Sequence, residues 1–318
     1  MQLTTDNRHP ITDHRASPQP LPLPMTRLEM NQLGWKELDI LLVSGDAYVD
    51  HPSFGIAIIG RVLLAKGYKV GIIAQPDWKN PSSLTGMGCP GLACAISSGN
   101  LDSMLNIYTA ARRIRKEDAY SPGGKTGLRP PHAAVVYSQL ARQAFPGTTV
   151  ILGGIEASLR RLAHYDYWQD KIKPSILMES KADILVYGMG EKAIVEIMDR
   201  IKEGKPLDSI KGTARFPGKN ASLQFNPNEQ FVEIPSYEEH LNNPEALLKS
   251  IVMLENEMNP FCGKGIFQRH GDRIVIQESP PLPLTGLELD EVYALPFTGK
   301  PHPSYLSLIH ISEPTRPY

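Results

Sequence analysis

Three loops of the sequence combine ionisable side chains with glycine or proline in a way that could bind a ligand. The first, residues 44–55, follows an apolar run and carries Asp46, Asp50 and His51. Two carboxylates and an imidazole in one loop could form an acid–base set for a hydrolase. The same side chains could instead cap loop and helix amides while the histidine packs internally. Because the set has no clear nucleophile or metal partner, hydrolysis ranks last among the functions considered.

The second loop, residues 153–161, starts with a glycine pair directly after an apolar run. Gly153 and Gly154 would let a ligand or another backbone approach closely. Glu156, Arg160 and Arg161 follow, and a guanidinium group suits a carboxylate or a phosphate. The alternative is an internal network of glutamate and arginine that fastens the edge of a sheet. The sequence leaves both possibilities open.

The third loop is a glycine-rich turn between a predicted strand and a predicted helix. Gly188 and Gly190 form the turn, and Glu191 follows them. A dinucleotide-binding fingerprint would need a third glycine at a spacing that is not met here. A tight turn in which Glu191 complements the helix dipole is therefore the simpler interpretation. Together the three loops define a candidate cleft.

The cysteines and the basic residues add no further site by their spacing. Cys89, Cys94 and Cys262 do not form the paired pattern of a zinc or cluster site, so we expect no metal ligands. A basic segment, residues 112–129, could clamp a phosphate or a nucleic-acid backbone. Such a run of charge is more typical of a solvated surface.

A parallel sheet would bring the three loops to one place. Short apolar runs predict strands at residues 38–43, 69–74, 92–96, 149–152 and 183–187. Helical spacing separates several of them, and a strand, helix, strand alternation builds parallel sheets. Ligands of such sheets bind outside the carboxyl ends of the strands, where the three loops would lie. The predicted fold class is therefore α/β, with an open, mostly parallel, Rossmann-like sheet.

The prolines and the changing pattern divide the chain into four segments. After residue 205 short strand-like pieces, a polar helix and a hairpin across residues 271–272 predict a smaller α+β appendage. The four segments are a disordered proline-rich lead (1–24), a Rossmann-like domain (25–205), an α+β extension (206–305) and a tail (306–318).

Composition limits the classes of partner. The chain has 318 residues, with 33 basic and 34 acidic side chains and a net charge of −1. That balance argues against a surface built mainly to bind nucleic acid or an anionic membrane. No apolar run reaches the roughly 18 residues of a membrane helix. Three cysteines in so long a chain form no disulfide framework, so the cytoplasm is the expected compartment.

Several long stretches resemble the N-terminal region of YgiQ-like radical SAM proteins, and the likeness covers nearly all of residues 22–305. The stretches are residues 44–55, 58–61, 71–76, 118–124, 153–161, 183–191, 268–271 and 302–305. The resemblance implies a cobalamin-binding-type Rossmann sandwich that precedes a radical SAM barrel. In that family the barrel holds a 4Fe-4S cluster on a Cys-x3-Cys-x2-Cys motif, and the cluster cleaves S-adenosylmethionine.

The sequence departs from the family after residue 305. It contains no Cys-x3-Cys-x2-Cys motif, and residues 306–318 are similar to translated sequencing-adapter DNA. We therefore expect a chain truncated before the barrel. It would be an accessory domain of a radical SAM iron–sulfur enzyme of unknown substrate, inactive alone, with that barrel as its partner.

One other function and one cofactor also need to be considered. A stand-alone module could bind a phosphorylated small molecule or RNA through Arg112, Arg113, Arg160 and Arg161. Cobalamin is not expected, because base-off domains supply an axial histidine in Asp-x-His-x-x-Gly. Here Asp50 and His51 are adjacent, and the next glycine stands at a different offset.

Overall fold

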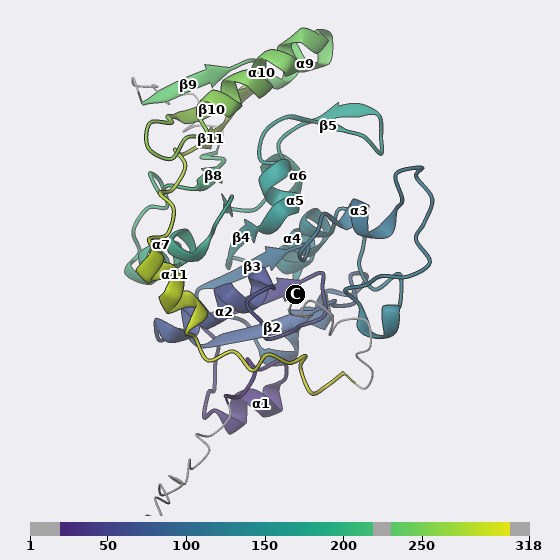
Figure 1. The fold of residues 1–318 in the computed structure, drawn as a ribbon, viewed down its shortest axis with the longest axis vertical. Coiled ribbons are helices and arrows are strands. Elements are labelled where there is room, and N and C mark those ends of the chain that lie inside the picture. The colour runs from purple at the N-terminus through teal and green to yellow at the C-terminus, as the bar shows by residue number, and fades with distance from the viewer. Residues whose placement is uncertain (1–19, 219–229, 306–318) are drawn as a thin grey trace, which may run out of the picture.

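Five parallel strands form the first half of one long sheet in the computed structural model, which describes residues 20–218 and 230–305 (Figure 1). In spatial order they are β2 (Val70–Ala74), β1 (Ile40–Ser44), β3 (Ala93–Ser97), β4 (Thr149–Gly153) and β7 (Ile184–Val186). All five residues of β1 are buried, as expected for a strand covered by helices on both faces. The predicted α/β class with a mostly parallel sheet is confirmed.

Alternate residues of β1 enter two different hydrophobic clusters, one on each face of the sheet. Ile40 and Leu42 pack with α2 (Gly55–Ala65) and α7 (Glu191–Glu203). Leu41 and Val43 pack on the other face. That face is covered by α1 (Arg27–Gln32), η1 (Pro81–Met87), α4 (Ala133–Ala144) and α6 (Ile176–Ser180). The period of two along a strand therefore sorts neighbouring side chains into the two layers.

The second half of the chain extends the same sheet. Next to β7 lie β8 (Thr213–Arg215), β11 (Arg273–Gln277), β10 (Gly265–His270) and β9 (Phe231–Ile234). The pairs from β7 to β10 are antiparallel, and β10 and β9 are parallel. The predicted appendage is thus hydrogen-bonded to the Rossmann-like part through β7 and β8, and the division at residue 205 stays a prediction.

A proline divides the helix that follows β9. The sequence pattern predicts one helix over residues 237–257, whereas the structure has α9 (Tyr237–Asn242) and α10 (Pro244–Asn256). Asn243 caps α10 by accepting a hydrogen bond from Glu245 N, and Pro244 occupies the first helical position. Proline is tolerated there because the first-turn amides have no intrahelical partner.

The remaining short elements lie mostly in the connections. They are α3 (Ser103–Ile107), η2 (Pro122–Gly124), α5 (Gly154–Leu159), β5 (His164–Asp166), β6 (Lys171–Lys173) and α11 (Gly286–Tyr293). None of the helices within the described residues is long and apolar enough to cross a membrane.

Both ends of the described chain pack against the β1–α2 region. Of the predicted proline-rich lead, Leu23 and Pro24 are buried, and the Pro24 carbonyl accepts a hydrogen bond from Ile72 N at 2.9 Å. At the other end, the Tyr305 hydroxyl accepts a hydrogen bond from Tyr48 N at 2.8 Å. The lead was predicted to be disordered over residues 1–24, but residues 23–24 pack against the fold; residues 1–19 and the unusual tail 306–318 lie outside the described residues.

Candidate functional site

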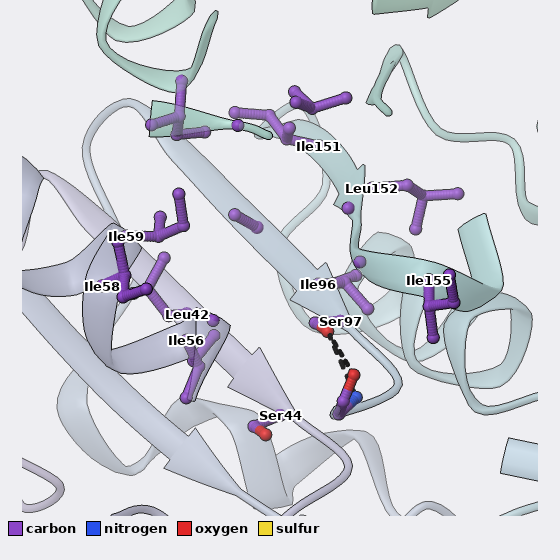
Figure 2. A pocket seen from close by; sticks show the side chains of 18 of the residues that line it. Leu42, Ser44, Ile56, Ile58, Ile59, Ile96, Ser97, Ile151, Leu152 and Ile155 are labelled. Carbon is purple, nitrogen blue, oxygen red and sulfur yellow. Dashed lines mark hydrogen bonds between the residues drawn. The ribbon is translucent and has the colours of Figure 1, made fainter. Parts of the chain in front are cut away.

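A pocket of about 290 Å³ opens at the carboxyl ends of the parallel strands (Figure 2). Residues at the ends of β1, β3, β4 and β7 line it, together with the start of α2 and the start of α7. Chain order reverses here, since β1 is followed by β2 on one side and by β3 on the other. This switch point is where open α/β sheets bind ligands.

The body of the pocket is apolar. Figure 2 shows the isoleucines of α2 on one side and those of β3, β4 and α5 on the other. The labelled members are Ile56, Ile58, Ile59, Ile96, Ile151 and Ile155. Ser44 and Ser97 lie where β1 and β3 end. An apolar cavity with a few convergent polar groups is the usual form of a small-molecule site.

Asp46 supplies one carboxylate to the pocket from the turn after β1. The residue is only about 1% exposed, and Oδ2 accepts a hydrogen bond from Asn100 N at 2.6 Å. Oδ1 lies 2.7 Å from Nη1 of Arg129. Burial raises the pKa of Asp46 to about 6, and the Arg129 charge opposes that rise. Asp46 is therefore a buried carboxylate with a hydrogen bond on Oδ2 and an ion pair, but no hydrogen bond, on Oδ1.

Arg129 joins the turns after β1 and β3. Its guanidinium donates a hydrogen bond to the Ser98 carbonyl at 2.7 Å and lies 3.3 Å from Oδ2 of Asp118. Gly99, with φ of +110°, brings its backbone against the Asp46 carboxylate, which occupies the space that a Cβ would need. These contacts fix the polar end of the pocket.

Some residues of the second predicted loop line the pocket, and others lie in the interior of the protein. Gly153 and Gly154 line the pocket, and a Cβ on Gly154 would lie 2.6 Å from Oγ of Ser97. Glu156 is fully buried and accepts hydrogen bonds from Ser103 N and Ala134 N, at 2.8 and 3.0 Å. Its carboxylate thus joins the starts of α3 and α4 rather than facing the pocket.

Both arginines of that loop make internal contacts. Arg160 forms an ion pair with Asp102 and lies 3.9 Å from Glu156. Arg161 donates a hydrogen bond to Gln277 Oε1 at 2.6 Å, and its guanidinium lies 4.8 Å from the centre of the Tyr187 ring. The structure therefore favours the network interpretation for this loop.

Asp50 and His51 do not line the pocket with Asp46. The buried Asp50 carboxylate pairs with Arg61 and accepts a hydrogen bond from Thr298 N at 3.0 Å. Nδ1 of His51 accepts a hydrogen bond from Ser53 N at 3.0 Å. Asp50 thus attaches the returning C-terminal segment, and the three side chains do not converge as an acid–base set would require.

All three residues of the third loop line the pocket. Gly188 and Gly190 form the turn after β7, and Glu191 begins α7. The Glu191 side chain is buried, and its Oε2 has no hydrogen-bond partner among the described residues. The pocket therefore brings together six of the eleven candidate residues, namely Asp46, Gly153, Gly154, Gly188, Gly190 and Glu191.

Sequence reasoning missed three features of the pocket. The isoleucines of α2 were predicted only as a helix face, and the turn at Ser97 and Asn100 was not considered as a ligand loop. That turn follows a predicted strand, as the other three do, and this signal could have found it. The pairing of Arg129 with Asp46 spans 83 positions and has no local signal.

The described residues contain no metal-ligand cluster. No group of three or more His, Cys, Asp or Glu side chains in residues 20–218 and 230–305 could hold a metal ion. Cys89 and Cys262 are exposed, and Cys94 is buried within β3.

Comparison with known proteins gives consistent relatives. A model of the radical SAM N-terminal family matches residues 22–314. UPF0313 protein blr7973 of Bradyrhizobium diazoefficiens is 46% identical, over 93% of this chain and 47% of that protein. UPF0313 proteins of Thermotoga maritima and Methanosarcina acetivorans are each 47% identical. The Thermotoga match covers 90% of this chain and 50% of that protein. The Methanosarcina match covers 89% of this chain and 41% of that protein. The chain spans about half the length of the curated relatives it matches.

Among solved structures, this chain is similar to the radical S-adenosylmethionine methyltransferase TsrM from Kitasatospora setae. The identity is 18% and the TM-score is 0.39, over 55% of this chain and 28% of that one. A second TsrM structure, with cobalamin and a [4Fe-4S] cluster bound, also has a TM-score of 0.39 and 18% identity, over 56% of this chain and 27% of that one.

Proposed function

The chain belongs to the radical SAM N-terminal family, and we propose that it supplies a small-molecule pocket to a radical SAM enzyme without performing the radical chemistry itself. One observation carries the proposal: the apolar cavity at the carboxyl ends of β1, β3, β4 and β7. Its polar end is held in one arrangement by Arg129 and Asp46. Polar groups that are held in one arrangement can bind a ligand in a defined orientation.

The residues of this chain do not fit an iron–sulfur cluster. In the family, a 4Fe-4S cluster with S-adenosylmethionine would supply the radical. Such a cluster is held by cysteine thiolates, and Cys94 is buried within a strand while Cys89 and Cys262 are exposed. We assign that chemistry to the part of the longer relatives that this chain does not match, which would then be its partner.

The proposal does not include cobalamin as a ligand of the pocket. The expectation that the chain binds no cobalamin rests on the missing axial-histidine motif and stays a prediction. No histidine is among the residues that line the pocket, and Nδ1 of His51 is engaged with Ser53 N. Titration of the chain with hydroxocobalamin checks this point, and a saturable spectral shift would contradict it.

The alternative of a module for RNA or a phosphorylated molecule has weaker support. Arg112 and Arg113 are exposed, whereas Arg160 and Arg161 turn inward. The four arginines therefore do not form one surface. No lysine or arginine lines the pocket either, and these side chains are common partners of phosphate groups.

A comparison of metal content tests the division of labour. The chain and the full-length Thermotoga maritima relative are reconstituted anaerobically with iron and sulfide. We expect the relative to retain a cluster and cleave S-adenosylmethionine, and the chain to retain no stoichiometric iron. A stoichiometric, oxygen-sensitive cluster in the chain alone would refute the proposal.

Binding of a neutral ring compound tests the pocket. We expect saturable binding of benzamide to the chain in ligand-observed NMR. Ile59→Trp should abolish it, because the larger side chain projects from α2 into the cavity. Leu248→Trp, at an exposed position of α10, is the matched control. Equal binding by both variants would place the compound elsewhere.

A further inference from the structure

Glu191 is a buried carboxylate with an unpaired oxygen inside an apolar pocket. The residue is 8% exposed, and its Oε2 has no hydrogen-bond partner among the described residues. It lines the cavity together with Ile59 and Ile194. Oδ1 of Asp46 has no hydrogen bond either, but it lies 2.7 Å from Nη1 of Arg129 in an ion pair, whereas no cation is paired with Glu191 among the described residues.

The fold alone does not explain this placement. Buried polar atoms in folded proteins nearly always have partners, and an unpaired buried charge is strongly destabilising. A glutamate in the first turn does complement the helix dipole, but an exposed glutamate at that position would do so equally. The neighbouring Lys192 offers no compensation, because its Nζ pairs with Glu288 at 2.7 Å.

The charged side chains that line the cavity are all acidic. Asp46 and Glu191 are the charged residues that line it, and no lysine, arginine or histidine does. Arg129, which reaches the polar end, is already paired with both Asp46 and Asp118. An anionic ligand would therefore meet the Glu191 carboxylate without a compensating cation. A ligand with an N–H group would instead give the unpaired Oε2 of Glu191 a hydrogen-bond donor.

We infer that the pocket binds a neutral or cationic molecule with an apolar ring, and that an N–H group of this ligand donates to Glu191. Glu191 is then a specificity-determining residue, which selects amines, amidines or amides and rejects carboxylates and phosphate esters. The isoleucines of α2, β3 and β4 provide the surface for the ring. This inference rests on the proposed function of the pocket and adds the class of ligand.

Three probes with the same ring and different head groups test the inference. Benzamidine is a cation, benzamide is neutral, and benzoate is an anion. Their affinities for the chain are measured at pH 8 by ligand-observed NMR. We expect benzamidine to bind at least tenfold more tightly than benzoate, with benzamide between them. Glu191→Gln should reduce the tenfold preference to threefold or less.

Glu196→Gln is the matched control, because it removes the same charge from an exposed position of α7 that pairs with Arg200. The preference should survive in that variant. If benzoate binds as tightly as benzamidine, or Glu191→Gln leaves the preference intact, the inference fails while the pocket stands. If none of the probes binds, both the inference and the proposed pocket fail. The wild-type series decides the charge preference even if a variant does not fold.

Discussion

The sharpest stability prediction concerns Arg129, whose removal leaves two carboxylates without their shared cation. Arg129→Met keeps an unbranched apolar stem but deletes the guanidinium. Asp46 loses a contact of 2.7 Å, Asp118 loses one of 3.3 Å, and the Ser98 carbonyl loses a donor. All four residues are buried, so water cannot replace the lost partner without opening the pocket rim.

The expected loss of stability is large and depends on pH. Breaking a buried ion pair by removing one partner costs about 3–5 kcal/mol. The pKa of Asp46 is already raised to about 6 by burial, so its contribution to stability is present at low pH and is lost as pH rises through 6. Without Arg129 that pKa rises further. The variant should therefore suffer more at pH 8 than at pH 5, where the carboxyl is protonated.

Urea unfolding of the chain at both pH values measures the effect. In thermal unfolding, the same loss of stability at pH 8 would lower the Tm by about 10 °C for a chain of this size. Arg269→Met is the matched control, because its ion pair with Glu233 is half exposed and should contribute about 0–1 kcal/mol. If the two variants lose similar stability, or if Arg129→Met costs the same at pH 5 and pH 8, the reasoning is refuted.

Two further predictions concern a glycine and a buried histidine. Gly99→Ala should cost at least about 2 kcal/mol more than Gly147→Ala in thermal unfolding, because both have positive φ but only Gly99 faces the Asp46 carboxylate; equal losses would argue against that contact. Burial lowers the pKa of His270 to about 4, so its stabilising contribution is lost as pH falls from about 6.5 towards 4, by up to about 3 kcal/mol. His270→Leu should flatten the pH dependence of urea unfolding in that range, and an unchanged slope would contradict the assigned cause.

Local patterns predicted the elements better than their grouping. The run of Leu38 to Val43 is apolar enough to identify a buried strand, and the structure places β1 at Ile40–Ser44. The hairpin across residues 271–272 was predicted from the same kind of local signal. The long polar helix was wrong at Pro244, where a proline can either begin a helix or break one. Only contacts with the rest of the fold decide between those outcomes.

The candidate site shows the same difference between features with a local signal and features that depend on distant residues. Glycine-rich turns after strands are local, and Gly153, Gly154, Gly188 and Gly190 all reached the pocket. The charged residues were less predictable, because a carboxylate or guanidinium can turn either way from the same backbone. Glu156, Arg160 and Arg161 found partners inside the protein.

What the sequence determined by itself was therefore the order of strands and turns, since hydrophobic period and glycine position are properties of neighbouring residues. Tertiary structure alone decided which charges face the cavity. Asp46 meets an arginine 83 positions away, whereas Oε2 of Glu191 meets no partner among the described residues. Pairing of buried charges depends on distances across the fold, and no spacing along the chain encodes those distances.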